Sequence, residues 1–219
     1  LSQCDVIYIS ADVPVSEKGR SDLAAVQALL DDVAAAARSD AVLVVFGPVP
    51  PGFSRSQTRH GRALYYQVDP LMFDEAPESA VDPVQLIVGC PDPAAALPGA
   101  LRRFLDLFDV PVVAMRYESA ELARFLLSLL RVSGAAATST IKELCEKAGA
   151  DWAELAPALA PDDPSPSQVT VPRPDVERDL SVLRRLAENH GVDASLIESS
   201  LADVRQRRNW VLQCLEEQV

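Results

Sequence analysis

The chain has 219 residues and a formal net charge of −12, with 48% hydrophobic and 24% charged residues, a composition typical of globular proteins that bury a core. At roughly 100–200 residues per domain, this length allows one large domain or two small ones and excludes an enzyme with two full Rossmann domains. The acidic charge repels phosphate backbones, and no apolar stretch reaches the roughly 20 residues of a membrane span, so we expect a cytoplasmic protein without a nucleic-acid or membrane partner.

The first half of the chain alternates β-branched runs with helical patterns. Residues 5–10 (DVIYIS) and 41–46 (AVLVVF) are apolar without alternation, as in strands that are buried on both faces of a parallel sheet. A helix beginning near Asp22 lies between them, which predicts a βαβ unit with a right-handed crossover. The further predicted elements are a helix at 55–64, strands at 65–68 and 85–89, a helix at 93–108 and a strand at 110–115. The fold class predicted for residues 1–116 is therefore α/β, with a partial Rossmann-like parallel sheet.

The second half of the chain, residues 117–219, lacks β-branched runs and is predicted to be an all-helical domain. A long helix is predicted from Glu118 to Lys147, because apolar side chains repeat there at helical spacing. These side chains are Leu122, Phe125, Leu126, Leu129 and Leu130.

The middle of this long helix has two interpretations. Gly134 and the alanines at 135–137 can form a continuous helical surface of small residues, which we favour. In the alternative, Thr140 and Glu143 form a capping box that begins a new helix.

A proline-rich connector is predicted at 157–174, because its apolar content is too low for it to fold alone. Two helices follow it. Asp175 or a neighbour caps the first, which ends near His190. Ser195 with Glu198 forms the capping box of the second. The apolar face of that second helix consists of Ile197, Leu201, Val204, Val211 and Leu215.

The cysteines are scattered, without the spacing of a zinc site or the pairing of a disulfide scaffold. They are Cys4, Cys90, Cys145 and Cys214. We therefore expect reduced thiols and no bound metal. His60 and His190 stand in polar surroundings without a nearby ligand partner, so both are expected at the surface.

Several motifs occur in one order along nearly the whole chain. The most specific are YESAELARFLLSLL at 117–130 and IKELCEKAGAD at 141–151. The others are DVIYISADVPVSEKGRSDLAAV at 5–26, FGPVPPG at 46–52, VDP at 68–70, QLIVG at 85–89 and DLSVLRRLAENHGVDASLIESSLADV at 179–204. Together they resemble the UDP-glucose/GDP-mannose 6-dehydrogenase family, from the second half of its NAD domain through its central helical dimerisation domain. The resemblance implies enzymes that oxidise the sugar C6 alcohol to a carboxylate, in two NAD-dependent steps, through a thiohemiacetal on a cysteine.

The same resemblance implies that this chain has lost the family's catalytic groups. In the register fixed by Asp179, Asp175 stands at the nucleophilic cysteine and Arg178 at the lysine of that motif, and a carboxylate cannot replace a thiolate. The family's catalytic positions are occupied by Pro48, Leu71, Ser128, Gly134 and Asp175, in place of threonine, glutamate, asparagine, lysine and cysteine. In addition, Ser139 and Thr140 replace an Asn-Glu pair. We therefore expect a truncated and degenerate member of the family with no catalytic residues.

The resemblance also implies an expectation for the cofactor site. The family's glycine-rich turn precedes the position that matches Leu1, and its sugar-nucleotide domain follows the position that matches Val219. We expect no cofactor on the isolated chain, with NAD implied by family analogy only. The favoured function is a catalytically inactive dimerising or partner-binding module. The alternative is one part of an NAD-dependent nucleotide-sugar dehydrogenase whose other sites lie on another segment or chain.

The expected partner is a second copy of this chain. The predicted dimer interface consists of Leu122, Phe125, Leu126, Leu129, Leu130 and Gly134, with burial inside one subunit as the alternative. The strand at 5–10 is expected to be an exposed apolar sheet edge, because the family pairs it with a strand of the other half. Such an edge invites pairing, so we expect a second copy, the proline-rich connector or a separate polypeptide in a hetero-complex to cover it.

Overall fold

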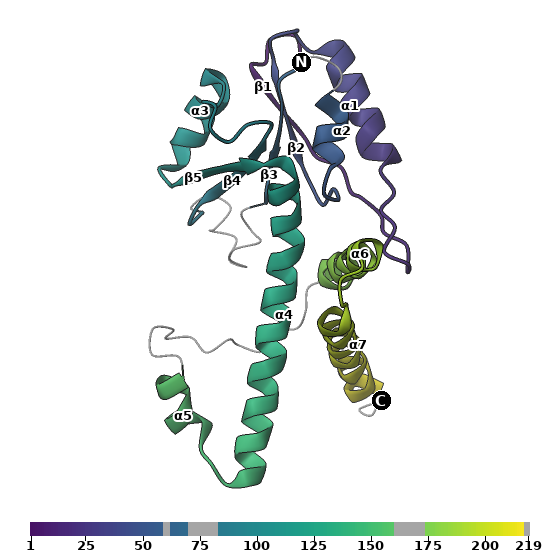
Figure 1. Cartoon of the computed structure of the whole chain (residues 1–219), viewed down its shortest axis with the longest axis vertical. Coiled ribbons are helices and arrows are strands. Elements are labelled where there is room, and N and C mark those ends of the chain that lie inside the picture. The colour runs from purple at the N-terminus through teal and green to yellow at the C-terminus, as the bar shows by residue number, and fades with distance from the viewer. Residues whose placement is uncertain (59–61, 70–82, 160–173, 217–219) are drawn as a thin grey trace. The chain divides into compact units, whose positions relative to one another are not determined.

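The computed structural model describes residues 1–58, 62–69, 83–159 and 174–216, and the chain divides into two compact units, 1–127 and 128–219. The first unit contains a five-stranded sheet whose strands lie in chain order (Figure 1). They are β1 (Val6–Ile9), β2 (Val42–Phe46), β3 (Leu64–Gln67), β4 (Leu86–Cys90) and β5 (Val112–Arg116). All neighbouring strands are parallel except β3 and β4, which are antiparallel. The predicted fold class, a partial Rossmann-like parallel sheet followed by helices, is confirmed, with the difference that the β3–β4 pair is antiparallel.

Helices cover both faces of this sheet. The helices α1 (Ala24–Ala36) and α2 (Phe53–Gln57) lie on one side, and α3 (Gly99–Leu105) with the short 3₁₀ helix η4 (Asp106–Phe108) lies on the other (Figure 1). Leu43 and Val45 of β2 are buried on the α1 side, whereas Val42 and Val44 are buried on the α3 side. This two-sided burial explains why the sequence of β2 is apolar without alternation.

The helix α4 (Tyr117–Ala148) starts directly after β5, and its first turns pack closely against the sheet. The Tyr117 hydroxyl donates a hydrogen bond to the backbone carbonyl of Leu64 at the start of β3. A Cβ on Gly89 of β4 would lie 3.0 Å from Ala120 Cβ, 3.1 Å from Tyr66 Cβ and 3.3 Å from Tyr117 Cα. This approach of helix to strand therefore depends on a glycine at position 89.

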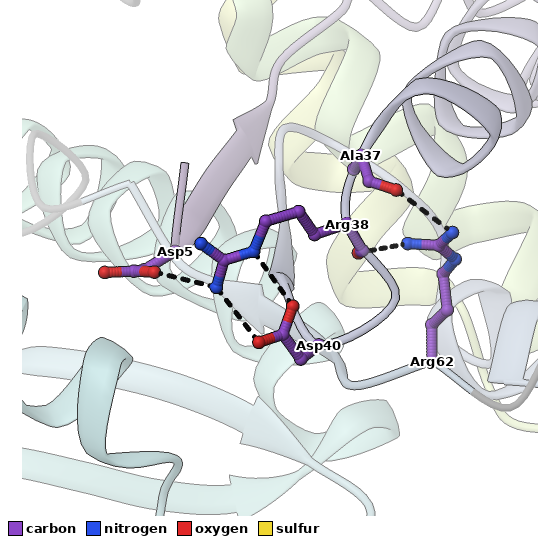
Figure 2. Close-up of polar contacts among 5 residues, drawn as sticks. All are labelled: Asp5, Ala37, Arg38, Asp40 and Arg62. Carbon is purple, nitrogen blue, oxygen red and sulfur yellow. Dashed lines mark hydrogen bonds and ion pairs between the residues drawn. The ribbon is translucent and has the colours of Figure 1, made fainter. Parts of the chain in front are cut away.

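A polar cluster joins the amino ends of the first strands, where Arg38 pairs with Asp5 at 3.1 Å and with Asp40 at 3.0 Å (Figure 2). Arg62 donates to the backbone carbonyls of Arg38, at 2.7 Å, and of Ala37, at 3.3 Å, just after the end of α1. Ligands of open α/β sheets bind at the opposite edge, where parallel strands have their carboxyl ends. These contacts therefore have a structural role, and because the charged groups are largely exposed each ion pair adds little stability.

Two predicted helices differ from the observed ones. The predicted helix at 55–64 is shorter in the structure and ends at Gln57, and Leu64 instead begins β3, because it pairs with Leu43 of β2. The predicted helix at 93–108 begins only at Gly99. Pro98 has extended backbone angles there, and a proline also disfavours helical angles in the residue before it.

The second unit is helical, as predicted. It contains the rest of α4, α5 (Trp152–Leu159), α6 (Pro174–His190) and α7 (Ser195–Glu216). The continuous interpretation of α4 is confirmed and the alternative of a new helix at Thr140 is wrong, since α4 continues to Ala148. The next residue is Gly149, whose φ of 75° favours glycine. The predicted domain boundary after residue 116 coincides with the start of α4 and stays a prediction.

The helix α5 was not predicted, and it includes residues 157–159 of the predicted connector. Pro157 lies inside α5, so a proline-rich composition did not exclude a helical turn at that point. Residues 160–173 of the predicted connector lie outside the described residues.

The predicted caps of α6 and α7 are corrected. Because α6 begins at Pro174, Asp175 lies inside its first turn rather than at the cap. Its negative charge interacts favourably there with the positive end of the helix dipole. The Ser195–Glu198 capping box is wrong, because both the N–H and the hydroxyl of Ser195 donate to Asp193 Oδ1. These two hydrogen bonds lower the pKa of Asp193.

The predicted apolar face of α7 is confirmed for Ile197, Leu201 and Val204, which are buried. The side chains of Val211 and Leu215 lie outside the described part of the chain. The helices α6 and α7 pack against each other, and Glu177 of α6 pairs with Arg205 at 2.7 Å and Arg208 at 2.6 Å of α7.

Replacing Gly89 with alanine should destabilise the first unit. The added methyl group meets two Cβ atoms and a backbone atom, so we expect a loss of about 1–3 kcal/mol in the free energy of unfolding. Urea denaturation followed by circular dichroism measures it. Gly99→Ala is the matched control, since its Cβ meets only the flexible end of Arg103 at 3.5 Å. Equal stability of Gly89→Ala and the unmodified chain would contradict the close packing of α4.

Candidate functional site

The loop between β2 and α2 (residues 47–52, GPVPPG) lies at the carboxyl edge of the parallel strands. It is tied to α4 by Glu121, which is fully buried. Its Oε2 accepts a hydrogen bond from Gly52 N at 2.6 Å, and its Oε1 accepts one from Ser54 N at 2.7 Å. Burial raises the pKa of Glu121, although hydrogen bonds from the Ser54 side chain and from the N–H groups of Ser54 and Gly52 act in the opposite direction. Gly52 adopts a φ of 92°, so the turn that presents these donors favours glycine.

Carboxylates face both helix starts that follow the first two strands. Glu121 accepts from the first turn of α2, and Asp22 Oδ1 accepts from Ala24 N at 3.1 Å at the start of α1. In doubly wound sheets the pyrophosphate of a dinucleotide binds such N–H groups. A phosphate would compete with a carboxylate at either position. Within the described ranges, therefore, the starts of α1 and α2 do not fit the pyrophosphate of NAD.

A buried polar pair links α4 to α6 in the second unit. Ser128 Oγ donates to Asp179 Oδ2 at 2.8 Å, and both side chains are almost completely shielded from water. Arg178 Nε lies 3.8 Å from the other oxygen of Asp179. A buried carboxylate needs such partners, because an uncompensated charge in the interior is costly. The serine at the family's asparagine position is therefore already bonded within the chain.

The other predicted site residues that the structure describes lie on different elements. Pro48 is half-buried in the loop after β2, and Asp175 is half-buried in the first turn of α6. Gly134 lies six residues beyond Ser128 on α4 and is exposed, with open space where a Cβ would be. Leu71 lies outside the described residues. The loss of chemistry at these positions stays a prediction.

The predicted interface residues do not share one environment. Phe125 is only 1% exposed, and Leu122 and Leu129 are half-buried. By contrast, Leu126 is 40% exposed and Leu130 is 69% exposed. The side of α4 that carries Leu130 continues toward its carboxyl end at spacings of three and four residues. We call these residues the α4 stripe: Leu130, Gly134, Ala137, Ile141 and Leu144.

Sequence reasoning missed Ile141 and Leu144 of the α4 stripe, which are 37% and 66% exposed. The helical spacing could have found them. It also missed Glu121 and Arg124, two buried charged side chains on successive turns of α4. The available signal was a glutamate and an arginine inside an otherwise apolar helical repeat, since charged residues are rarely fully buried without a partner.

The remaining candidate ligands are dispersed. Cys4 is exposed, Cys90 and Cys145 are buried, and all three are free thiols. His190 is exposed, whereas His60 and the side chain of Cys214 lie outside the described residues. Among the side chains that the structure describes, no group of three or more His, Cys, Asp or Glu could hold a metal ion. None of the described helices is long and apolar enough to cross a membrane.

Comparison with known proteins extends these observations. No protein-family model matches the chain. The UDP-glucose 6-dehydrogenase of Rickettsia conorii is 23% identical, and the match covers 94% of this chain and 50% of that protein. The UDP-glucose 6-dehydrogenase TuaD of Bacillus subtilis is also 23% identical, with 72% of this chain and 36% of that protein covered.

Solved structures share the fold of this chain. The UDP-glucose dehydrogenase of Pyrobaculum islandicum matches 98% of this chain and 53% of its own length, with a TM-score of 0.76 and 19% identity. The GDP-mannose dehydrogenase of Pseudomonas aeruginosa matches 97% of this chain and 53% of its own, with a TM-score of 0.57 and 15% identity. The chain is a homologue of the nucleotide-sugar 6-dehydrogenases. It spans about half the length of the curated relatives named above, or less.

In this dehydrogenase homologue, Ser128→Ala should destabilise the second unit. It leaves a buried oxygen of Asp179 without its hydroxyl donor, so we expect a loss of about 1–3 kcal/mol in the free energy of unfolding, measured by urea denaturation. The control is Ser181→Ala on α6, whose buried hydroxyl donates only to the Glu177 carbonyl of its own helix and should matter less. Equal losses for the two variants would contradict a special role for the buried pair.

Proposed function

We propose that this chain is a non-catalytic relative of the nucleotide-sugar 6-dehydrogenases that acts as a dimerising or partner-binding module. Two features support the absence of catalysis. In the family register, Asp175 and Gly134 stand where a thiolate and an ammonium group are needed, and neither can supply that chemistry. The N–H groups at the starts of α1 and α2 are bonded to carboxylates rather than left open to phosphate.

The exposed α4 stripe is the observation that carries the dimerising role. Leu130 and Leu144 each expose about two thirds of their surface, and Gly134 and Ala137 between them are small. Apolar surface removed from water contributes about 25 cal/mol per Å², so a partner that covers the stripe gains stability. Small residues at its centre allow two helices to approach closely. The proposed occupant of the stripe is a second copy of α4.

An antiparallel pair of α4 helices with its two-fold axis at Ala137 makes the stripe self-complementary. Leu130 and Leu144 are equally far from Ala137 in the sequence, so each leucine of one copy faces the other leucine of its partner.

The second candidate is a part of an NAD-dependent nucleotide-sugar dehydrogenase whose other sites lie on another segment or chain. The edge strand β1 favours it. Among the described residues, β2 is the only strand paired with β1. Ile7 and Ile9 are buried, so β1 is part of the core on its side-chain face while its outer backbone edge can accept a further strand.

Leu144→Glu should weaken the dimer without unfolding the chain, because it places a charge at a position of the stripe that is exposed in one copy. We expect the dissociation constant to rise at least about tenfold, measured by light scattering after size-exclusion chromatography, with unchanged circular dichroism. Leu196→Glu is the matched control, since Leu196 is 60% exposed on α7, outside the stripe. An unmodified chain that stays monomeric at about 100 μM would overturn the proposed dimer.

Calorimetric titration of the chain with NAD should give no binding heat. The carboxylates at the two helix starts exclude the pyrophosphate, so any dissociation constant should lie above about 1 mM. Micromolar binding would overturn the non-catalytic proposal. Co-purification then separates the two candidates: a stable complex with an active dehydrogenase supports the second, and a homodimer alone supports the first.

A further inference from the structure

Both sides of α4 carry apolar side chains in the second unit. Val132, on one side, is 7% exposed, whereas Leu130, two residues before it, is 69% exposed. Two residues correspond to about 200° around a helix with 3.6 residues per turn, so these side chains point in nearly opposite directions. A pair of helices that packs against α4 could cover either side. Hydrophobic burial, which has no direction, does not by itself select between them.

The side of α4 that faces α6 and α7 also carries hydroxyl groups. Ser128 lies four residues before Val132, so the two share this side of the helix. The Oγ of Ser128 donates to Asp179 Oδ2 of α6 at 2.8 Å. One turn further along α4, Ser133 Oγ lies 3.2 Å from Ser200 Oγ of α7, within hydrogen-bond distance. Hydroxyl groups of α4 are thus bonded to both α6 and α7.

The α4 stripe offers no such group. Its residues are leucine, glycine, alanine and isoleucine, so none of them has a side-chain hydrogen-bond donor. If α6 packed against the stripe, Asp179 would lose its bond to Ser128 and lie beside apolar groups instead. The Asp179 side chain is completely buried in the observed arrangement, and a buried carboxylate that loses a donor is costly. The stripe is therefore a poor surface for α6.

We propose that Ser128 and Asp179 are a specificity pair, which selects the side of α4 against which α6 and α7 pack. Removing one partner of a buried polar pair is destabilising, but replacing both by apolar groups of similar size is often neutral. Such a pair can therefore specify an arrangement without adding to its stability. In this chain it leaves the α4 stripe uncovered. That a second copy then binds the stripe rests on the proposed function, whereas the selection of the covered side does not.

Thiol labelling of the full chain, resolved by mass spectrometry of its peptides, tests the specificity pair. Val132→Cys reports the covered side, and Gly134→Cys reports the stripe, where a Cβ meets open space. Without further changes, Val132→Cys should react slowly and Gly134→Cys rapidly. In the double variant Ser128→Ala/Asp179→Leu, both sides of α4 become acceptable to α6. With the two arrangements about equally populated, Val132→Cys should react at least about tenfold faster and Gly134→Cys about twofold more slowly.

Slower labelling of Gly134→Cys is the decisive signal, because a loss of stability exposes residues and cannot protect one that is already exposed. Labelling at about 1 μM and about 100 μM separates this signal from the dimer. Protection by a second copy increases with concentration, whereas protection by α6 and α7 does not. Ser181→Ala is the matched control, since that buried hydroxyl donates to the Glu177 carbonyl of its own helix, and it should leave the rate at Gly134→Cys unchanged.

Two results would overturn the specificity pair. One is unchanged labelling of Val132→Cys in a double variant whose circular dichroism shows a folded chain. The other is faster labelling of Val132→Cys without slower labelling of Gly134→Cys, which would mean that the pair only stabilises the second unit. If the double variant does not fold, Ser128→Ala alone is measured, and the same two results decide. An unmodified chain that stays monomeric would overturn the proposed dimer but not the specificity pair.

Discussion

Close packing between the first turns of α4 and the sheet is the constraint on which the first unit depends. Tyr117, Ala120 and Glu121 lie at i, i+3 and i+4, so they share one face of the helix. On that face the tyrosine binds β3, the alanine contacts β4 at Gly89, and the glutamate anchors the loop after β2. Three segments that are far apart in the sequence are thus fixed by one helical turn. All three side chains belong to the YESAEL motif, so this motif has a structural reason that does not require catalysis.

The parts of the fold that could be predicted are those whose burial produces a recognisable hydrophobic pattern in the local sequence. β2 is apolar without alternation because both of its faces are covered, and α4 shows helical spacing over many turns. Short elements depend on contacts that the local sequence does not contain. The local sequence predicts Leu64 as the end of a helix. In the structure Leu64 pairs with Leu43 and is the first residue of β3. Similarly, the antiparallel pairing of β3 with β4 could not be predicted from the composition of either strand.

The candidate site divides in the same way. The family register brought Ser128 to attention, but its bond to Asp179 joins residues 51 positions apart and could not be predicted from spacing. Glu121 was missed because a buried carboxylate becomes recognisable only with its two backbone donors in place. Periodicity predicted an apolar face on α4, yet Phe125 is buried while Leu130 is exposed. Apolar side chains occupy more than one side of this helix, so their spacing alone does not tell which side is left for a partner.

The composition of the α4 stripe determines how the affinity of the proposed dimer depends on salt. Ser128, Val132 and Cys145 are buried within one copy, and the α4 stripe lies on other positions of the helix. A chain with a net charge of −12 repels its own copies, but ions screen that repulsion beyond roughly 8 Å at physiological salt. The stripe itself carries no charge, so its burial supplies the affinity and should depend little on salt.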